Sequence, residues 1–269
     1  MKIAITTSSF ARYSDEPLKL LEQAGVEYVM NDLPDLKVIS RCGTGMDNVD
    51  RAYAAEKGIE VRNTPDGPTL AVAELTLGLI LTLLRQVPHQ DRELRSGVWK
   101  KRMGNLLHGK NVGIVGFGKI GQAVAHLLEP FGVNVGYHDP FADVPGYTRL
   151  ELDDLMGWAD VITLHCPKTE NGAPLLDLGR LSLMRPGSII LNIARGGLID
   201  EKALLGLLTA GHLAGAALDC FTKEPYDGPL KEMDNVILTP HIGSYAKEAR
   251  IIMETDTIKN LLDVLFPGA

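Results

Sequence analysis

Residues 111–139, NVGIVGFGKIGQAVAHLLEPFGVNVGYHD, decide the fold. The run NVGIV and the later run VNVGYHD are typical of buried strands, and the pattern between them is helical. Gly116, Gly118 and Gly121 stand at the turn from the first strand into the helix. In a strand–turn–helix–strand unit, this spacing indicates a loop that binds the pyrophosphate of a dinucleotide. A tight turn without a ligand is the alternative.

Each of these glycines has a role in that reading. Gly116 permits the turn, Gly118 lets backbone amides approach the pyrophosphate, and Gly121 lets the helix pack against the strand. Asp139, at the end of the second strand, can accept hydrogen bonds from both ribose hydroxyls and would repel a 2'-phosphate. Neither of the next two residues is an arginine. The stretch therefore predicts NAD rather than NADP, unless Asp139 is only a solvated strand end.

Outside this stretch, apolar runs and helical patterns keep alternating to residue 241. Runs such as DVITLHC and SIILNIA lack polar alternation, which predicts a doubly wound parallel sheet covered on both faces. Before residue 66, a shorter series of the same units predicts a second, smaller α/β domain. The helical pattern in residues 244–265 could fold back onto that first domain.

Composition excludes several classes of partner. The net charge of −7 over 269 residues offers no basic field for nucleic acid or an anionic membrane. The most apolar segment, residues 70–84, is shorter than the roughly 20 residues of a membrane span and contains Glu74. It is better explained as a core helix or a subunit contact. The N-terminus lacks a secretory signal, and three widely spaced cysteines without metal-type pairing suit a reducing cytoplasm.

Three polar residues follow predicted strands at the edge where a dinucleotide would lie. A hydride-transfer enzyme needs an acid for the emerging alkoxide and a cation that fixes the substrate. Arg195 follows the strand SIILNIA, His241 follows the last strand, and Glu224 lies in the loop before that strand. A Glu–His pair beside an arginine is therefore expected at the cleft. A structural ion pair for Arg195 and a surface or core position for His241 are the alternatives.

Several motifs stand in an order that resembles the D-isomer-specific 2-hydroxyacid dehydrogenase family, especially its phosphoglycerate dehydrogenase branch. They are RCGTGMDNVD, NTPDGPTLAVAELTLG, GFGKIG, HCPKT, NIARGGLIDEKAL, GAALDCFTKEP and TPHIGSYAKEA. The resemblance implies an NAD-binding Rossmann domain over residues 71–245 and a flavodoxin-like substrate domain from residues 1–70 and 246–269. It also implies a homodimer. The apolar helix over residues 72–84 is a candidate dimer surface, with a role in the domain core as the alternative.

Residue by residue, the resemblance makes Arg195 the cation that orients substrate, His241 the acid–base group and Glu224 its partner. Glu224 would stabilise the imidazolium while NADH delivers hydride to C2 of a small 2-oxo acid with an anionic tail. The implied cofactor contacts are Thr44, Gly116, Gly118, Lys119, Ile120, Gly121, Asp139, Cys166, Pro167, Ile193, Ala194, Asp219, His241 and Gly243. The implied substrate contacts are Arg41, Gly43, Thr44, Gly45 and Arg195, although Arg41 could equally form a surface salt bridge.

Three features of the sequence bear on which branch of the family it resembles. Formate dehydrogenases of this fold would be expected to carry Gln in place of Glu224, which disfavours that branch. The chain ends at FPGA, so no serine-sensing domain and no serine feedback are expected. Only NDLPD separates two strands between which the family places about two further elements, which predicts a truncated substrate domain. A non-enzymatic NAD-binding regulator of the same fold, or a related activity such as phosphite oxidation, is the alternative function.

Overall fold

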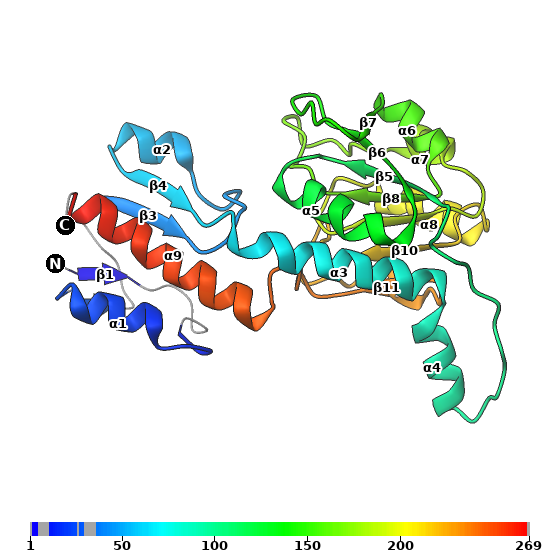
Figure 1. Ribbon diagram of the computed structural model, residues 1–269, viewed down its shortest axis with the longest axis horizontal. Coiled ribbons are helices and arrows are strands. Elements are labelled where there is room, and N and C mark those ends of the chain that lie inside the picture. Colours follow the sequence, from blue (N-terminus) through cyan, green and yellow to red (C-terminus); the bar gives the residue numbers. More distant parts are fainter. Residues whose placement is uncertain (1, 5–10, 26, 30–35, 268–269) are drawn as a thin grey trace. The chain divides into compact units, whose positions relative to one another are not determined.

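The computed structural model describes residues 2–4, 11–25, 27–29 and 36–267 (Figure 1). The chain divides into two compact units. Unit 1 consists of Met1–Ala71 and Ser244–Ala269, and unit 2 is the continuous segment Val72–Gly243. The predicted link NDLPD, residues 31–35, lies outside the described residues.

Unit 2 contains a seven-stranded sheet in which all strands are parallel, ordered β11-β10-β9-β8-β5-β6-β7. The strands are β5 (Asn111–Val115), β6 (Asn134–His138), β7 (Thr148–Arg149), β8 (Val161–Leu164), β9 (Ile189–Asn192), β10 (Gly215–Leu218) and β11 (Val236–Leu238). The chain runs outward from β5 to β7, returns to β8, and then runs outward in the other direction. This order confirms the predicted doubly wound fold and makes the carboxyl ends of β5 and β8 its switch point.

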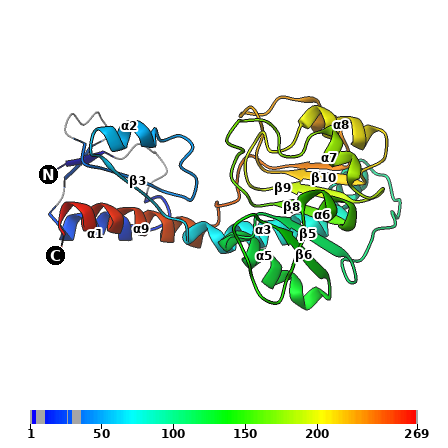
Figure 2. The same ribbon diagram turned by 90° about the horizontal axis from the view of Figure 1, so that it is seen from above.

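Helices cover both faces of this sheet, as Figure 2 shows. Leu155, Leu181 and Leu204 of α6, α7 and α8 belong to one buried cluster, whereas Ile80 and Val124 of α3 and α5 belong to another. The helices are α3 (Gly67–Leu84), α4 (Val87–Arg95), α5 (Lys119–Leu128), α6 (Leu152–Trp158), α7 (Leu178–Leu183) and α8 (Glu201–Thr209), with 3₁₀ helices η1 (Glu129–Phe131) and η2 (Pro229–Glu232). A sheet with two apolar faces therefore has both faces removed from water.

Helix α3 is the apolar segment singled out in the sequence, and it begins three residues earlier than expected. By length and composition, this 18-residue helix could cross a membrane, but half of it is buried inside the protein. Ala73 and Ile80 are completely buried in the core of unit 2, whereas Glu74 is exposed. This burial is typical of a core helix.

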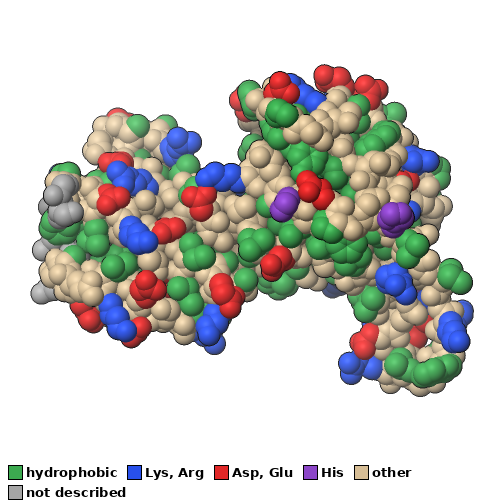
Figure 3. Space-filling model, in the orientation of Figure 1, with side chains coloured by type: hydrophobic (Ala, Val, Ile, Leu, Met, Phe, Trp, Pro, Cys, Tyr) green, Lys and Arg blue, Asp and Glu red, His purple; other side chains and the backbone are tan. Residues whose placement is uncertain are grey.

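Residues 87–106 form a segment that we call the arm: α4 followed by a stretch without regular structure. Several of its apolar side chains are exposed to solvent: Trp99, Met103 and Leu106 are 83%, 91% and 73% exposed. Arg102 donates two hydrogen bonds to Glu93, of 2.7 and 2.6 Å, which pin the stretch back onto α4. That guanidinium lowers the pKa of Glu93 to about 2. Figure 3 shows the arm projecting at the lower right.

In unit 1, the described parallel strands form two separate pairs, β1 with β2 and β3 with β4. Helix α9 contacts α1, β3 and β4. Buried Glu254 of α9 accepts hydrogen bonds from Arg250 Nη2 at 2.6 Å and from the N–H of Ala11 at 2.8 Å. The elements are β1 (Lys2–Ala4), α1 (Glu16–Gln23), β2 (Glu27–Val29), β3 (Val38–Arg41), α2 (Arg51–Glu56), β4 (Glu60–Asn63) and α9 (Lys247–Leu265).

Candidate active site

The glycine loop lies between β5 and α5, as predicted. Gly116 has φ +91°, and a Cβ there would come within 2.7 Å of the backbone nitrogen of Cys166. A Cβ on Gly121 would overlap the carbonyl oxygen of Gly116. By contrast, a Cβ on Gly118 would meet no described atom within 4 Å, and no side chain caps the helix that starts at Lys119. The loop thus leaves space beside Gly118 at the N-terminus of the helix, where backbone N–H groups can bind a pyrophosphate.

Asp139 lies beside this loop at the end of β6. Its Oδ2 accepts a hydrogen bond from the N–H of Phe117 at 2.7 Å, and its Oδ1 accepts from Phe141 and Ala142 at 2.8 and 3.0 Å. Partial burial acts to raise the pKa of Asp139, but these backbone bonds outweigh it and hold the pKa below its usual value. The side chain is therefore an anion with lone pairs left for a ribose, and it also braces the glycine loop.

Four further predicted cofactor contacts lie at or beside the switch point. Cys166 and Pro167 follow β8, and the contact with Gly116 brings Cys166 against the loop after β5. Burial raises the pKa of the Cys166 thiol to about 11, so it is protonated at neutral pH. Lys119 and Ile120 form the first turn of α5.

Arg195 lies in a turn held by Asn192, a residue not singled out in the sequence. Asn192, only 2% exposed at the end of β9, donates to the carbonyl oxygen of Arg195 at 2.8 Å and accepts from the N–H of Ala194 at 3.2 Å. The guanidinium donates to the carbonyl oxygen of Ala194 at 2.7 Å. Ile193 and Ala194 are both buried. The sequence signal that could have revealed this support is a polar residue, Asn192, inside the apolar run IILNIA.

Gly196 brings this turn against the loop after β10. A Cβ at Gly196 would overlap the carbonyl group of Phe221 and lie 2.8 Å from the backbone nitrogen of Thr222. Only glycine permits this approach, which places the Arg195 turn beside the loop that carries Glu224.

Asp219 organises the last loop of unit 2. The carboxylate is 1% exposed, and it accepts hydrogen bonds from Thr239 Oγ1 at 2.6 Å and from the N–H groups of Ile242 and Gly243, each at 2.8 Å. The role implied for Asp219 was a contact with the cofactor. In the structure its bonds hold the residues on both sides of His241, and the hydroxyl of Thr239 was not anticipated.

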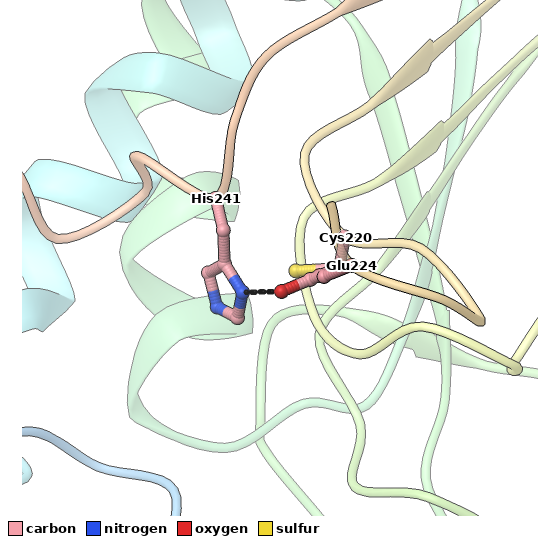
Figure 4. Close-up of side chains that lie close together, drawn as sticks. All are labelled: Cys220, Glu224 and His241. Carbon is pink, nitrogen blue, oxygen red and sulfur yellow. Dashed lines mark hydrogen bonds and ion pairs between the residues drawn. The ribbon is translucent and has the colours of Figure 1, made fainter. Parts of the chain in front are cut away.

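His241 and Glu224 form the predicted pair (Figure 4). His241 Nδ1 lies 3.1 Å from Glu224 Oε2, and both side chains are roughly half exposed. The other carboxylate oxygen of Glu224 accepts from the N–H of Phe221 at 3.1 Å. Partial burial acts to raise the pKa of Glu224, but its bonds to His241 and Phe221 hold the pKa below the usual value. His241 has φ +54°, a conformation uncommon outside glycine, which the Asp219 bonds hold in place.

Cys220 lies beside this pair. Its sulfur donates a weak hydrogen bond to the carbonyl oxygen of Ala194 at 3.5 Å. Burial, together with the charges of Asp219 and Glu224, raises the pKa of Cys220 to about 12. Cys220 is thus a protonated thiol at neutral pH and is not an activated nucleophile.

The predicted substrate residues of unit 1 lie in the loop after β3. Gly43 has φ +128°, and its N–H donates to Thr64 Oγ1 at 2.7 Å. The amide of Gly43, a position expected to contact the substrate, is therefore engaged within unit 1. Arg41 donates to the carbonyl oxygen of Cys42 at 3.0 Å and lies over Gly43. Thr44 is exposed and Gly45 partly exposed.

Comparison with known proteins gives consistent matches. Residues 77–243 match the family profile "D-isomer specific 2-hydroxyacid dehydrogenase, NAD binding domain". The chain is 40% identical over 238 residues to D-3-phosphoglycerate dehydrogenase of Synechocystis sp., covering 86% of this chain and 43% of the relative. It is 42% identical over 246 residues to that of Methanocaldococcus jannaschii, covering 88% and 47%. The TT0316 protein of Thermus thermophilus has a TM-score of 0.90 at 35% identity, covering 98% of this chain and 97% of that chain. The chain thus spans less than half the length of the two curated relatives.

Proposed function

The chain belongs to the D-isomer specific 2-hydroxyacid dehydrogenase family and carries its NAD-binding domain, and from this premise we propose that it is an NAD-dependent oxidoreductase. It transfers hydride between nicotinamide and C2 of a small D-2-hydroxy acid. The observation that carries the proposal is the Glu224–His241 pair, 3.1 Å apart, in the same unit as the glycine loop. An acid–base pair beside a nucleotide site is what this chemistry requires.

In the proposed mechanism, NADH supplies the hydride when it is bound. His241, positively charged and paired with Glu224, donates a proton to the carbonyl oxygen of the substrate as that oxygen becomes an alkoxide. In the reverse direction, the neutral ring takes the proton back. Arg195, fixed by Asn192, attracts the substrate carboxylate. Glu224 stabilises the imidazolium by charge and by its hydrogen bond.

We assign the cofactor role to unit 2, which also carries Arg195, Glu224 and His241, and we assign further substrate contacts to unit 1. Within unit 1, the proposed substrate contacts are Thr44, Gly45 and Arg41, since the N–H of Gly43 already has a partner in Thr64. Within unit 2, the proposed cofactor contacts are the helix N–H groups of Lys119 and Ile120 and the carboxylate of Asp139. The curated relatives are named phosphoglycerate dehydrogenases, which favours a substrate with an anionic tail.

The test is NADH oxidation by the purified protein against a panel of 2-oxo acids: 3-phosphohydroxypyruvate, hydroxypyruvate, glyoxylate, pyruvate and 2-oxoglutarate. Turnover of one of them, with the phosphorylated acid preferred, is the expected result. No turnover on the panel, with NADH bound, would contradict the proposed activity, whereas turnover of pyruvate alone would contradict the anionic tail.

Replacing Asp139 with Ser is expected to relax the preference for NADH. The variant loses the charge that repels a 2'-phosphate, so the ratio of kcat/KM for NADH to that for NADPH should fall by about tenfold or more. The loss of the bond to Phe117 disturbs the glycine loop for both cofactors alike, so this damage cancels in the ratio. An unchanged ratio would count against the role of Asp139 in cofactor choice.

The proposed dimer rests on the arm rather than on α3, because the apolar residues of the arm are exposed while much of α3 is buried. Apolar side chains clustered in the open mark an interaction surface. We expect light scattering to give about twice the 29.2 kDa chain mass for the wild type, and the mass of one chain for Trp99→Asp with Met103→Asp. Leu178→Asp, at an exposed position on α7, is the matched control and should stay dimeric. A monomeric wild type would exclude the dimer.

The proposed compartment is a reducing cytoplasm. Cys42, Cys166 and Cys220 are all free thiols in the structure. Free cysteines without disulfides are typical of proteins kept in reducing surroundings.

A further inference from the structure

We propose that Cys220, Glu224 and His241 form a binding site for a thiophilic divalent cation such as Zn²⁺, and that the bound cation inhibits the enzyme. One sulfur, one carboxylate oxygen and one imidazole nitrogen, supplied by these residues, all lie within 4.8 Å of one another (Figure 4). They come from two loops, one after β10 and one after β11. The proposed metal binding is inferred from this geometry alone. The proposed inhibition also rests on the proposed function.

The donor set and the spacing suit zinc. Zn²⁺ binds thiolate sulfur at about 2.3 Å and imidazole nitrogen or carboxylate oxygen at about 2.0–2.2 Å, with tetrahedral geometry. Ligand atoms around such an ion are therefore about 3.3–3.6 Å apart. Glu224 and His241 are already 3.1 Å apart, so side-chain shifts of about 1 Å would bring all three into place. Three protein ligands leave the fourth position to water.

Binding has a defined proton balance. The Cys220 thiol, which now donates to Ala194, loses its proton to solvent, since a coordinated thiol is deprotonated. His241 binds through Nδ1 and keeps its ring proton at Nε2. One thiolate and one carboxylate then neutralise the two charges of the cation.

The surrounding charges are balanced. Asp219 and Glu224 place negative charge near the Cys220 sulfur, while Arg195 and Lys168 place positive charge there. One of the two negative groups, Glu224, is itself a proposed ligand. When the cation binds, the hydrogen bond between His241 and Glu224 is replaced by a bond from each residue to the metal. Neutral His241 bound through Nδ1 is a much weaker proton donor than an imidazolium, so its role as the acid is lost.

The first experiment measures metal binding without turnover. The full chain is titrated with Cd²⁺, and the ultraviolet charge-transfer band of a cadmium thiolate is recorded. We expect one equivalent to bind, with the band lost in Cys220→Ala and retained in Cys42→Ala, the matched control in unit 1. His241→Gln, which keeps all three thiols, should bind about tenfold or more weakly. A band that persists in Cys220→Ala, or that is unaffected in His241→Gln, would overturn the site.

The second experiment measures how Zn²⁺ inhibits NADH oxidation. The rate of each variant with Zn²⁺ is compared with the rate of the same variant without metal. Cys220→Ala is expected to need about tenfold or more Zn²⁺ for half inhibition, and Cys42→Ala to match the wild type. Equal sensitivity of Cys220→Ala and the wild type would overturn inhibition through this site. If no 2-oxo acid is turned over, the proposed function fails, while the cadmium band still decides the site.

Discussion

Replacing His241 with Gln is expected to lower kcat for 2-oxo acid reduction by about 10²-fold or more, the range of general acid–base catalysis. Glutamine can still form hydrogen bonds, but it cannot carry a proton to the substrate. His241 already adopts φ +54°, a conformation that is unfavourable for any residue other than glycine. Glutamine should be strained by about the same amount there, so the variant should have a similar melting temperature. NADH binding, measured by fluorescence titration, should be retained.

The partner residue sharpens this test. Glu224→Gln should also lower kcat, because the imidazolium loses its compensating charge. If Glu224 acts through His241, the double variant should be no slower than His241→Gln alone, since residues that act as a unit are not additive. Turnover of His241→Gln within a few-fold of the wild type would remove His241 from the proposed role.

Gly196→Ala is expected to damage the site as severely, although Gly196 provides no chemistry. The new methyl group would overlap the carbonyl of Phe221, so the two loops must separate. Phe221 donates its N–H to Glu224, and the movement therefore displaces the acid–base pair. We expect a loss of about 10²-fold in kcat/KM, the scale of an ångström misplacement. Overpacking should also lower the free energy of unfolding by about 1–3 kcal/mol.

Gly206→Ala is the matched control for this substitution. Gly206 lies within α8, and a Cβ there would meet no described atom within 4 Å. Alanine should stabilise the helix by about 0.5–1 kcal/mol and leave turnover unchanged. Denaturant unfolding and steady-state kinetics on the two variants give the comparison. Wild-type activity in Gly196→Ala would mean that the contact with Phe221 does not position Glu224.

The parallel sheet of unit 2 was predictable because its strands are continuous apolar runs. Helix α4 was not predicted, since VPHQDRELR has too few apolar residues to make a helical stripe. Strand β7, with two exposed residues, is too short for any pattern. In unit 1, the separation of the strands into two pairs depends on contacts between distant segments, which periodicity does not reveal.

The site was predictable where side chains follow strands. Glu224 and His241 pair as the sequence indicated. The supports were harder to foresee, because the bonds of Asp219 to Thr239 and Ile242 join loops that are 20 or more residues apart. The proposed cation site would be missed by any search for paired cysteines, since its candidate ligands are three different residue types.

The division of the chain has a consequence for the order of folding during synthesis. Unit 2 is one continuous segment, Val72–Gly243, and its two ends lie together, since a Cβ on Gly243 would come 3.3 Å from Val72. It can therefore fold before α9 becomes available. Unit 1 must wait for α9, which supplies Glu254 to the N–H of Ala11, 243 residues earlier. Released chains that are truncated before residue 247 should hold a protease-resistant unit 2 and an unfinished unit 1.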